Sequence, residues 1–310
     1  MTLDVIVVSY GSGRLIAGCV RAALSFAGQG AHVVLVDNAP GDGAGGEAAA
    51  VAPLCTVIEN VRNMGYAAAV NQGIAAGKSE LVLLLNPDIS SVRGDFDEVV
   101  EAFRENPRLA ALTPLLVAPD GLPEPTCRRE PRPFDLVSEA LDLAARFPTW
   151  QRPKRFRMLE LENEGERVVD AATGACLFLR RAALDDVGPF DESFFVYWEE
   201  TDWLIRAKRR GWITLYRPHI EAVHVSRGST NLSDDSMSLL LLESQYTYAR
   251  KHFGRIVATA LRAALTALDA LGWARGLARG RAVRRASMRR RLRVHLTGRA
   301  PRPVQASNRL

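Results

Sequence analysis

The sequence predicts an α/β fold built around a mostly parallel central sheet. Through the first half of the chain, short apolar runs alternate with segments of helical periodicity, as in βαβ units. The apolar runs are continuous, which is typical of strands buried on both faces. With 310 residues, 47% of them hydrophobic, the chain is long enough to bury one large core.

The first half supplies most of the expected sheet. A Gly-rich loop at 41–46 separates the second strand from the third. Between the other strands, apolar residues recur with a helical period. The expected strands are 3–8, 32–36, 55–59, 81–85 and a short one near 109–113, and the expected helices are 12–27, 64–77 and 95–105.

The second half predicts a loop excursion and then a helical extension. Residues 119–166 are rich in Pro, Arg and Glu, and we expect a functional loop there with one helix near 134–147. The sheet resumes near 168–169 and 175–179, followed by a helix over 199–210 and strands near 213–216 and 221–225. From about residue 233 the pattern is helical. We therefore expect an α/β domain over 1–232 and a C-terminal helical extension over 233–310.

Charge is distributed unevenly. Residues 270–310 hold 12 Arg and no acidic residue, whereas residues 1–269 hold 28 basic and 35 acidic groups. Apolar residues between Ile256 and Trp273 recur on one helical face. The tail is therefore either a helix packed on the domain with a solvated end, or a peripheral anchor on an anionic membrane, where each Arg is worth about 1 kcal/mol. No nucleic-acid recognition motif accompanies the charge.

The sequence shows no transmembrane segment, secretion signal or metal-binding cysteine pattern, and these features predict the cellular compartment. No stretch is long and apolar enough to span a bilayer, and the chain opens directly into a strand. The four cysteines are scattered without metal-ligand spacing, which favours a reducing compartment. We expect a cytoplasmic protein, peripheral on the inner face of the cell membrane.

Polar residues end two of the expected strands. Asn86-Pro87-Asp88 follows the run 81–85, and Asp37 closes the run 32–36. Ligands of open α/β sheets bind at the carboxyl ends of the strands, and a carboxylate there is a hard ligand for Mg²⁺ or Mn²⁺. Both segments are equally typical of ordinary turns without a ligand. Asn63, which precedes the next helix, fits an N-cap as well as a ligand-binding residue.

Six motifs in sequence order identify a resemblance. The chain resembles bacterial family 2 glycosyltransferases with the GT-A fold, and especially the rhamnosyltransferase-like branch that builds cell-envelope polysaccharides. The resemblance covers roughly residues 3–230. The motifs are Val8-Ser9-Tyr10, Val36-Asp37-Asn38, Asn63-x-Gly65 with Asn71, Asn86-Pro87-Asp88, Gly174-Ala175-Cys176-Leu177 and Phe194-Phe195-x-Tyr197-Trp198-Glu199-Glu200-x-Asp202.

The resemblance implies a donor site that binds a nucleoside diphosphate and a divalent cation, Mg²⁺ or Mn²⁺. Asp88 would bind the metal, with Asn86 in place of the first acid of the Asp-x-Asp motif, and His224 would complete the site. The cation would stabilise the leaving diphosphate as a Lewis acid. The other donor-binding residues implied or expected are Ser9, Tyr10, Asp37, Asn63, Asn71 and Arg227.

The resemblance also implies a catalytic helix start. Inverting transfer needs one carboxylate to deprotonate the acceptor hydroxyl. The family pattern Glu-Asp-x-Asp reads Glu199-Glu200-Thr201-Asp202 here, so Glu200 falls at the base position with one extra methylene. The charge of Glu199 would stabilise the first turn of the helix, although the reverse assignment, with Glu199 as the base, stays open. Asp202 would help to position the other residues of the site.

The acceptor would meet an aromatic surface and a glycine. Tyr197 and Trp198 offer a flat face to a sugar ring, and Gly174 allows close approach of the backbone, although core packing and a plain turn are alternatives. The predicted function is inverting transfer of rhamnose or a similar sugar from a dTDP- or UDP-sugar to a glycan or polyprenyl-diphosphate-linked acceptor.

Two other functions remain open from the sequence. A sugar nucleotidyltransferase would need a Gly-rich basic loop after the first strand, which residues 9–14 match loosely. A binding scaffold without catalysis would account for the departures at Asn86 and Glu200.

Overall fold

The computed structural model describes residues 1–159, 165–225, 234–278 and 283–302. Their contacts divide into two compact units. The first contains the sheet, and the second contains residues 131–154, residues 193–198 and the helices after residue 233. The division into domains 1–232 and 233–310 stays a prediction, and the sequence pattern did not separate the two shorter stretches of the second unit.

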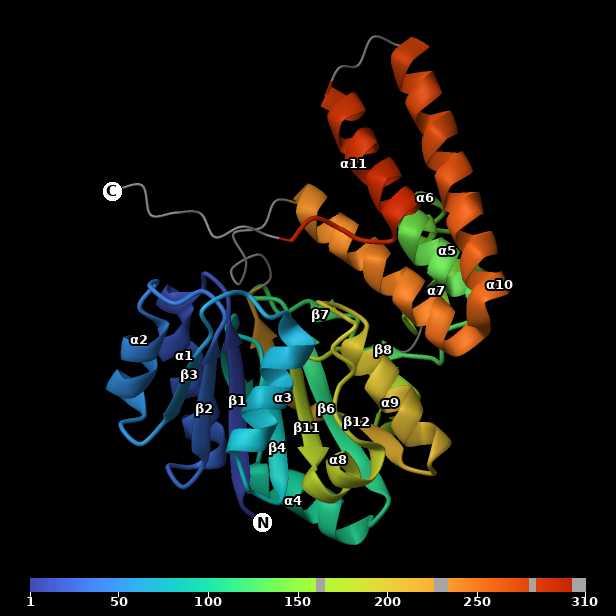
Figure 1. Ribbon diagram of the computed structural model, residues 1–310. Coiled ribbons are helices and arrows are strands. Elements are labelled where there is room, and N and C mark those ends of the chain that lie inside the picture. Colours follow the sequence, from blue (N-terminus) through green and yellow to red (C-terminus); the bar gives the residue numbers. More distant parts are fainter. Residues whose placement is uncertain (160–164, 226–233, 279–282, 303–310) are drawn as a thin grey trace. The chain divides into compact units, whose positions relative to one another are not determined.

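The sheet of the first unit is mixed (Figure 1). Four neighbouring strands, β3 (Thr56–Glu59), β2 (His32–Asp37), β1 (Leu3–Ser9) and β4 (Leu81–Leu85), are parallel. The next strand, β11 (Cys176–Arg180), runs antiparallel to β4 and to β6 (Leu109–Val117). The sheet continues with β12 (Ile213–His224), which is parallel to β6, and β5 (Ile89–Arg93), which is antiparallel to β12.

Short strands extend this framework. β7 (Pro123–Glu124) pairs with β6, and β9 (Arg167–Val169) pairs with β12. A separate two-stranded ladder joins β8 (Cys127–Arg128) to β10 (Ala171–Ala172). These pairings hold the ends of the 119–166 excursion against the sheet.

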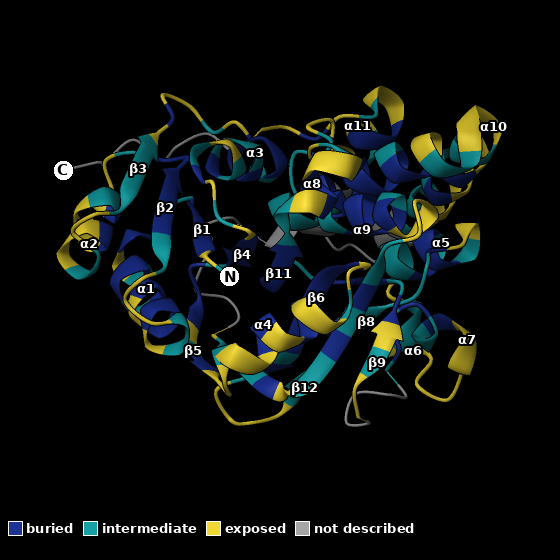
Figure 2. Ribbon diagram, turned by 90° about the horizontal axis from the view of Figure 1, so that it is seen from below, coloured by how far each residue is buried: buried dark blue, intermediate teal, exposed yellow. Residues whose placement is uncertain are grey.

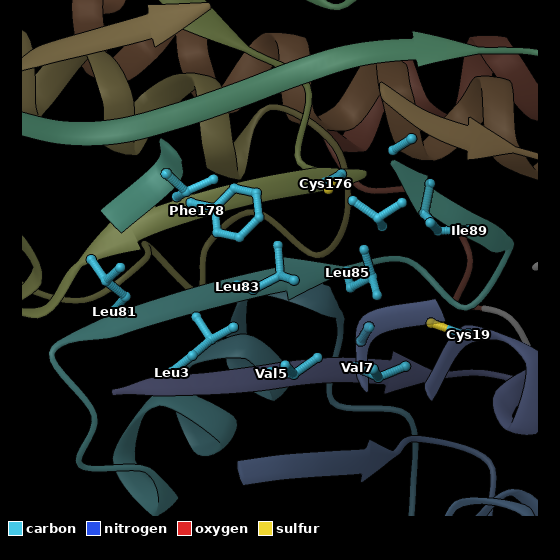
Figure 3. Packing of buried hydrophobic residues seen from close by; sticks show 14 of the residues in the cluster. Leu3, Val5, Val7, Cys19, Leu81, Leu83, Leu85, Ile89, Cys176 and Phe178 are labelled. Atoms are coloured by element: carbon cyan, nitrogen blue, oxygen red, sulfur yellow. The ribbon is translucent and has the colours of Figure 1, made fainter. Parts of the chain in front are cut away.

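Successive side chains of β1 and β4 point to opposite faces of the sheet, so the core has two layers. Leu3, Val5 and Val7 face the same side as Leu81, Leu83 and Leu85, where Figure 3 shows them beside Cys176 and Phe178. Helices α1 (Gly13–Ala27), α2 (Ala44–Val51) and α4 (Phe96–Glu105) cover that side. Helices α3 (Tyr66–Ala76), α8 (Arg181–Val187) and α9 (Glu199–Arg209) cover the other. Both faces of the central strands are therefore buried (Figure 2), which explains their continuous apolar sequences.

Several elements differ from the sequence expectation. α2 begins inside the expected loop 41–46, and β5 and α8 were not predicted. The two strands expected at 213–216 and 221–225 are one strand, β12, with a register shift between Arg217 and Glu221. The helix expected near 134–147 is divided into α5 (Pro133–Leu141) and α6 (Leu143–Arg146) at Asp142, which is left-handed with φ of 50°, and α7 (Gln151–Lys154) follows.

The second unit is dominated by two helices. α10 (Asp234–Ala278) bends at Gly254, whose φ is 82°, and α11 (Val283–Thr297) packs beside it. Leu261 and Leu265 of α10 and Val294 of α11 are buried. Tyr246 Oη lies 2.5 Å from His295 Nδ1, and His295 Nε2 lies 2.8 Å from Asp269 Oδ2, so a buried polar network also joins the helices. No helix among the described residues is both long and apolar enough to cross a bilayer.

Candidate active site

The carboxyl ends of β1 and β2 place two predicted donor-binding residues side by side. Ser9 pairs with Asp37 in the ladder, and both side chains are buried. The Asp37 carboxylate accepts a hydrogen bond from the Ala39 N–H at 2.9 Å. Burial raises the pKa of Asp37 in spite of that bond, and the nearby charges of Asp42 and Glu59 add to the rise. A hydrogen-bond donor on a bound nucleotide would stabilise the ionised form of this carboxylate.

The loop after β1 is held by its own side chains. Ser9 Oγ and Ser12 Oγ are 3.1 Å apart, and the Tyr10 N–H donates to Ser12 Oγ at 3.4 Å. The Gly13 N–H donates to Asp42 Oδ2 at 2.9 Å, and a Cβ at Gly13 would lie 2.2 Å from the Asp42 carbonyl oxygen. The close approach of the two loops therefore requires glycine at position 13.

Two other predicted donor-binding residues have structural partners. Asn63 Oδ1 accepts from the Gly65 N–H at 2.9 Å, which is an Asx turn leading into α3. The Asn71 amide donates to the Phe190 carbonyl oxygen at 2.9 Å and to Glu192 at 3.0 Å, and its oxygen accepts from the Phe190 N–H. Asn71 thus ties α3 to the 190–192 loop. Arg227 lies outside the described residues.

β5 has a bulge where it pairs with His224 at the end of β12. Val223 is paired with Ser91 of β5 and His224 with Ile89, so one residue of β5 is skipped. His224 Nε2 then lies 3.2 Å from Asp88 Oδ1, and His224 Nδ1 lies 2.7 Å from Glu124 Oε2. Burial by itself lowers the pKa of His224, but the carboxylates of Asp88 and Glu124 outweigh it and raise the pKa to about 9.

The Asp88–His224 pair fits a divalent cation. Asp88 is 4% exposed, and its Oδ1 atom has no hydrogen-bond partner in spite of the nearby imidazole. The 3.2 Å separation of Oδ1 and Nε2 is that of an ion pair. A carboxylate oxygen and an imidazole nitrogen are also both donors that bind divalent cations, so the chemistry of this pair suits such an ion. No group of three or more His, Cys, Asp or Glu side chains in the described ranges is placed to hold a metal.

Asn86 is held in the turn between β4 and β5. Its N–H donates to the Ala175 carbonyl oxygen at 2.8 Å, and its own carbonyl oxygen accepts from the Ile89 N–H at 3.1 Å and from Cys19 Sγ at 3.3 Å. The Tyr66 hydroxyl donates to Asn86 Oδ1 at 3.4 Å. These bonds fix the backbone that carries both Asn86 and Asp88.

The two predicted catalytic glutamates open α9 in a buried setting. Glu199 Oε2 and Glu200 Oε2 are buried and have no hydrogen-bond partner. Burial raises the pKa of Glu199 well above its ordinary value, and the charge of Glu200 adds to the rise. Burial also raises the pKa of Glu200. Backbone N–H groups oppose the rise at both glutamates, and the charge of Arg128 opposes it at Glu200.

Tyr66 lies near three of the predicted site residues. Burial raises the pKa of its hydroxyl, and the negative charges of Glu199, Glu200 and Asp88 raise it further. Buried acceptors without a hydrogen-bond partner are rare in folded proteins, so the oxygens of Glu199 and Glu200 indicate a site for a ligand that supplies donors or a cation.

Asp202 and Gly174 support this arrangement. Asp202 is fully buried and accepts from Arg206 Nε at 2.9 Å, while the same guanidinium donates to the carbonyl oxygens of Val187 and Pro189. This fixes α9 to the end of α8. A Cβ at Gly174 would lie 3.6 Å from the Glu200 side chain, so Gly174 lies beside the predicted base.

Tyr197 and Trp198 belong to the second unit. Trp198 is 5% exposed, and its ring centroid lies 5.0 Å from that of Tyr248. The Trp198 ring is thus packed in that unit, as in the core-packing alternative, and Tyr197 is partly exposed. The acceptor-binding role of the two residues stays a prediction.

The sequence did not assign Tyr66, Glu124 or Arg128 to the site. Tyr66 follows the Asn63-x-Gly65 motif directly, so its position offered a signal. Glu124 and Arg128 lie in the excursion after β6, and no local pattern relates them to His224 or Glu200. Their roles depend on contacts between residues about 100 and 70 positions apart in sequence.

Comparisons with known proteins agree with this architecture. The model of the glycosyl transferase family 2 matches residues 4–188. The N-acetylglucosaminyl-diphospho-decaprenol L-rhamnosyltransferase of Mycobacterium tuberculosis is 32% identical over 268 residues, which cover 81% of this chain and 85% of that protein. A low-salt glycan biosynthesis hexosyltransferase of Haloferax volcanii is 26% identical over 156 residues, 49% of this chain and 46% of that one.

A solved structure shares the fold. The mannosyltransferase of Pyrobaculum calidifontis, in complex with GDP-Man and Mn²⁺, matches 95% of this chain and 87% of its own with a TM-score of 0.54 and 18% identity. This likeness and the family match confirm the predicted GT-A α/β fold. The chain belongs to glycosyl transferase family 2, and it is a glycosyltransferase similar to the rhamnosyltransferases of that family.

Proposed function

We propose that this glycosyltransferase moves rhamnose or a similar sugar, with inversion, from a dTDP- or UDP-sugar to a polyprenyl-diphosphate-linked GlcNAc acceptor in cell-envelope polysaccharide synthesis. The observation that carries the chemistry is that Asp88, paired with His224, and the glutamates Glu199 and Glu200, whose buried Oε2 atoms have no hydrogen-bond partner, all act on the Tyr66 hydroxyl through their charge. The acceptor class is supported by the 32% identity to a decaprenol-linked GlcNAc rhamnosyltransferase over most of both chains.

Asp88 and His224 would hold the divalent cation, Mg²⁺ or Mn²⁺. When bound, the cation would act as a Lewis acid on the diphosphate of the donor. Asp88 would supply the charge, and Glu124 would orient the imidazole of His224 through its bond to Nδ1, with Nε2 directed at Asp88. Ser9 and Asp37 lie at the ends of the neighbouring strands, where a nucleoside would bind.

Glu200 would act as the general base. The base must be ionised to take the proton of the acceptor hydroxyl as the sugar is transferred. The charge of Arg128 and backbone N–H groups favour the ionised form of Glu200, which supports its assignment as the base. Glu199 would stay protonated beside it because two buried carboxylates at close range do not both ionise. The single displacement then gives inversion.

The decisive experiment is a transfer assay with the purified full-length chain. The donors are dTDP-rhamnose, UDP-rhamnose and GDP-mannose, and the acceptor is a short polyprenyl-diphosphate GlcNAc analogue. Each reaction is run with Mg²⁺, Mn²⁺ or EDTA, and the products are identified by mass spectrometry. We expect a rhamnosylated product that EDTA abolishes. Donor binding without any transfer would instead favour the scaffold alternative, and transfer only from GDP-mannose would overturn the assigned donor.

We also propose peripheral attachment to an anionic membrane through α10 and α11. Beyond Gly254, Ile256, Leu268 and Leu271 of α10 are 86%, 43% and 54% exposed, and exposed alanines lie between them. Among the α11 residues whose exposure is described, 289–297, the arginines Arg289, Arg290 and Arg293 are exposed. An exposed apolar face accompanied by cations is typical of helices that bind at a membrane surface. Such attachment would bring the enzyme close to a lipid-linked acceptor in the membrane.

A further inference from the structure

The start of the excursion after β6 contributes side chains to two parts of the candidate site. Glu124 of β7 bonds to His224, beside Asp88. Four residues further along, β8 carries Arg128, which is partly buried and whose charge acts on Glu200. A partly buried guanidinium in a site otherwise rich in carboxylates is suited to binding an anionic group of a substrate.

Contacts within its own segment fold the Arg128 side chain back along β8. Nη1 donates to the Pro125 carbonyl oxygen at 2.7 Å and to the Cys127 carbonyl oxygen at 2.9 Å. The guanidinium carbon lies 5.9 Å from the centre of the buried Phe156 ring, within cation–π range. Carbonyl oxygens and aromatic rings carry no net charge, so these contacts fix the guanidinium without neutralising it.

The ladder between β8 and β10 brings this guanidinium to the start of α9. The Thr173 N–H, just after β10, donates to the Thr126 carbonyl oxygen at 3.0 Å. The next residue, Gly174, is the one whose Cβ would lie 3.6 Å from the Glu200 side chain. Because its guanidinium is turned back towards the start of β8, Arg128 presents its charge at the end of the ladder that meets Glu200.

Ion pairs tie the same ladder to the last turn of α9. The N–H of Glu130, just after β8, donates at 2.8 Å to Oδ2 of Asp170, just before β10. Lys208 Nζ lies 2.8 Å from Glu130 Oε2 and 2.9 Å from Asp170 Oδ1, and Arg209 donates to Glu130 Oε1 at 3.0 Å. The helix that carries the proposed base is therefore fixed to the ladder at both of its ends.

An acceptor of the proposed kind needs a cation close to the base. Its reacting hydroxyl and its diphosphate are attached to the same sugar ring, so the diphosphate comes within the width of that ring of Glu200. The carboxylates of Glu199 and Glu200 would repel it. A guanidinium offsets that repulsion and donates two parallel N–H bonds to phosphate oxygens.

We propose that Arg128 binds the diphosphate of the acceptor and thereby selects diphosphate-linked sugars over neutral glycans. This inference rests on the proposed function, since it takes Glu200 as the group that meets the acceptor hydroxyl. The donor also carries a diphosphate, which the proposed function assigns to the cation at Asp88 and His224, beside Glu124. The experiment separates the two diphosphates.

The test compares Arg128→Met with Arg104→Met, which removes an exposed arginine of α4 in the same unit. Each chain is assayed with a short polyprenyl-diphosphate GlcNAc analogue and with the neutral octyl glycoside of GlcNAc. Arg128→Met should lower the ratio of kcat/KM for the diphosphate acceptor to that for the neutral one by roughly 10- to 100-fold, the usual effect of losing a hydrogen bond to a charged group. Arg104→Met should leave the ratio unchanged, and Arg128→Lys should retain part of it.

The ratio distinguishes acceptor binding from other roles of Arg128. A change in the ionisation of Glu200 would lower transfer to both acceptors by the same factor. A lost contact with the donor diphosphate would raise the donor KM equally with both acceptors. An unchanged ratio in Arg128→Met would therefore overturn the inference, and activity on the neutral acceptor shows that the variant is folded.

Calorimetry tests the same contact without turnover. The diphosphate acceptor analogue is titrated into each chain with dTDP and Mn²⁺ present, and Arg128→Met should bind it more weakly than Arg104→Met by a similar factor. Equal affinity of the two variants, or no binding by the unchanged chain, would contradict the inference. An unchanged chain that binds the acceptor through Arg128 but transfers no sugar would disprove the proposed function and leave the binding site standing.

Discussion

Asp88 illustrates how a single side chain is prepared for a ligand. Four features converge on it: the end of β4, the turn fixed through Asn86, the bulge of β5 opposite His224, and an oxygen without a hydrogen-bond partner. An acceptor left unpaired inside a protein costs stability. A cation that bridges Asp88 and the donor diphosphate would remove that cost.

The role of Asp88 gives a prediction about donor binding. Asp88→Asn keeps the size of the side chain but removes the charge that the cation needs, so the dependence of donor affinity on Mn²⁺ or Mg²⁺ should disappear. Calorimetry of the nucleoside diphosphate with and without the ion measures this. Asp185→Asn, at an exposed position of α8, is the control and should bind as the unchanged chain does. A metal effect that survives in Asp88→Asn would contradict the assignment.

At the scale of elements, the helices that cover the sheet position the site by packing closely. α3 carries Tyr66 at its first residue, and Gly73 of the same helix lies against β1, where a Cβ would come 2.5 Å from Ile6 Cγ2. Close contact of α3 with β1 therefore depends on Gly73. The position of Tyr66 between Asn86 and the glutamates follows from that packing.

Gly73→Ala should destabilise the fold by roughly 1–3 kcal/mol, the usual cost of forcing a methyl group into a packed core. Gly46→Ala in α2 is the matched control. Nothing lies within 4 Å of a Cβ there, and alanine favours a helix over glycine by roughly 0.5–1 kcal/mol. Urea unfolding of both variants measures the two effects. Equal stability of the two variants would show that α3 is not held as closely as described.

The sequence predicted the parallel core strands because their apolar runs are continuous, as at Leu81–Leu85. It missed β5, since Ile89–Arg93 alternates buried and exposed residues at the edge of the sheet and contains two serines. It missed α2 because Ala44–Val51 begins with two glycines after its first residue, which local propensity assigns to a loop. In the candidate site, motifs predicted roles for Asp88, His224 and Glu200, whereas no local pattern encodes the contact of Glu124 with His224.

At the scale of the whole molecule, the C-terminal extension has a buried side and an exposed side. Its buried side joins α10 to α11 through Tyr246, His295 and Asp269. Its exposed arginines can be changed without touching these buried residues, so variants of the arginines test the proposed membrane attachment without disturbing the packing of the two helices.

Membrane attachment predicts a charge-dependent association with vesicles. Changing Arg289, Arg290 and Arg293 together to Gln should weaken binding to phosphatidylserine-containing vesicles, and binding by the unchanged chain should fall as salt rises because exposed charges are screened. The control changes Arg21, Arg93 and Arg104, exposed arginines of the first unit. Sedimentation that finds all three chains bound equally would rule out the anchor.

The central claim is that Glu200, held beside a protonated Glu199, takes the proton of the acceptor hydroxyl in an inverting transfer. The most direct measurement is turnover of Glu200→Gln and Glu199→Gln with the anomeric configuration of the product determined by NMR. Glu200→Gln should bind the donor normally and lose roughly 10²–10⁴-fold in kcat, while Glu199→Gln should lose much less. The product should carry the configuration opposite to that of the donor. Full activity of Glu200→Gln, or a product with retained configuration, would contradict the account.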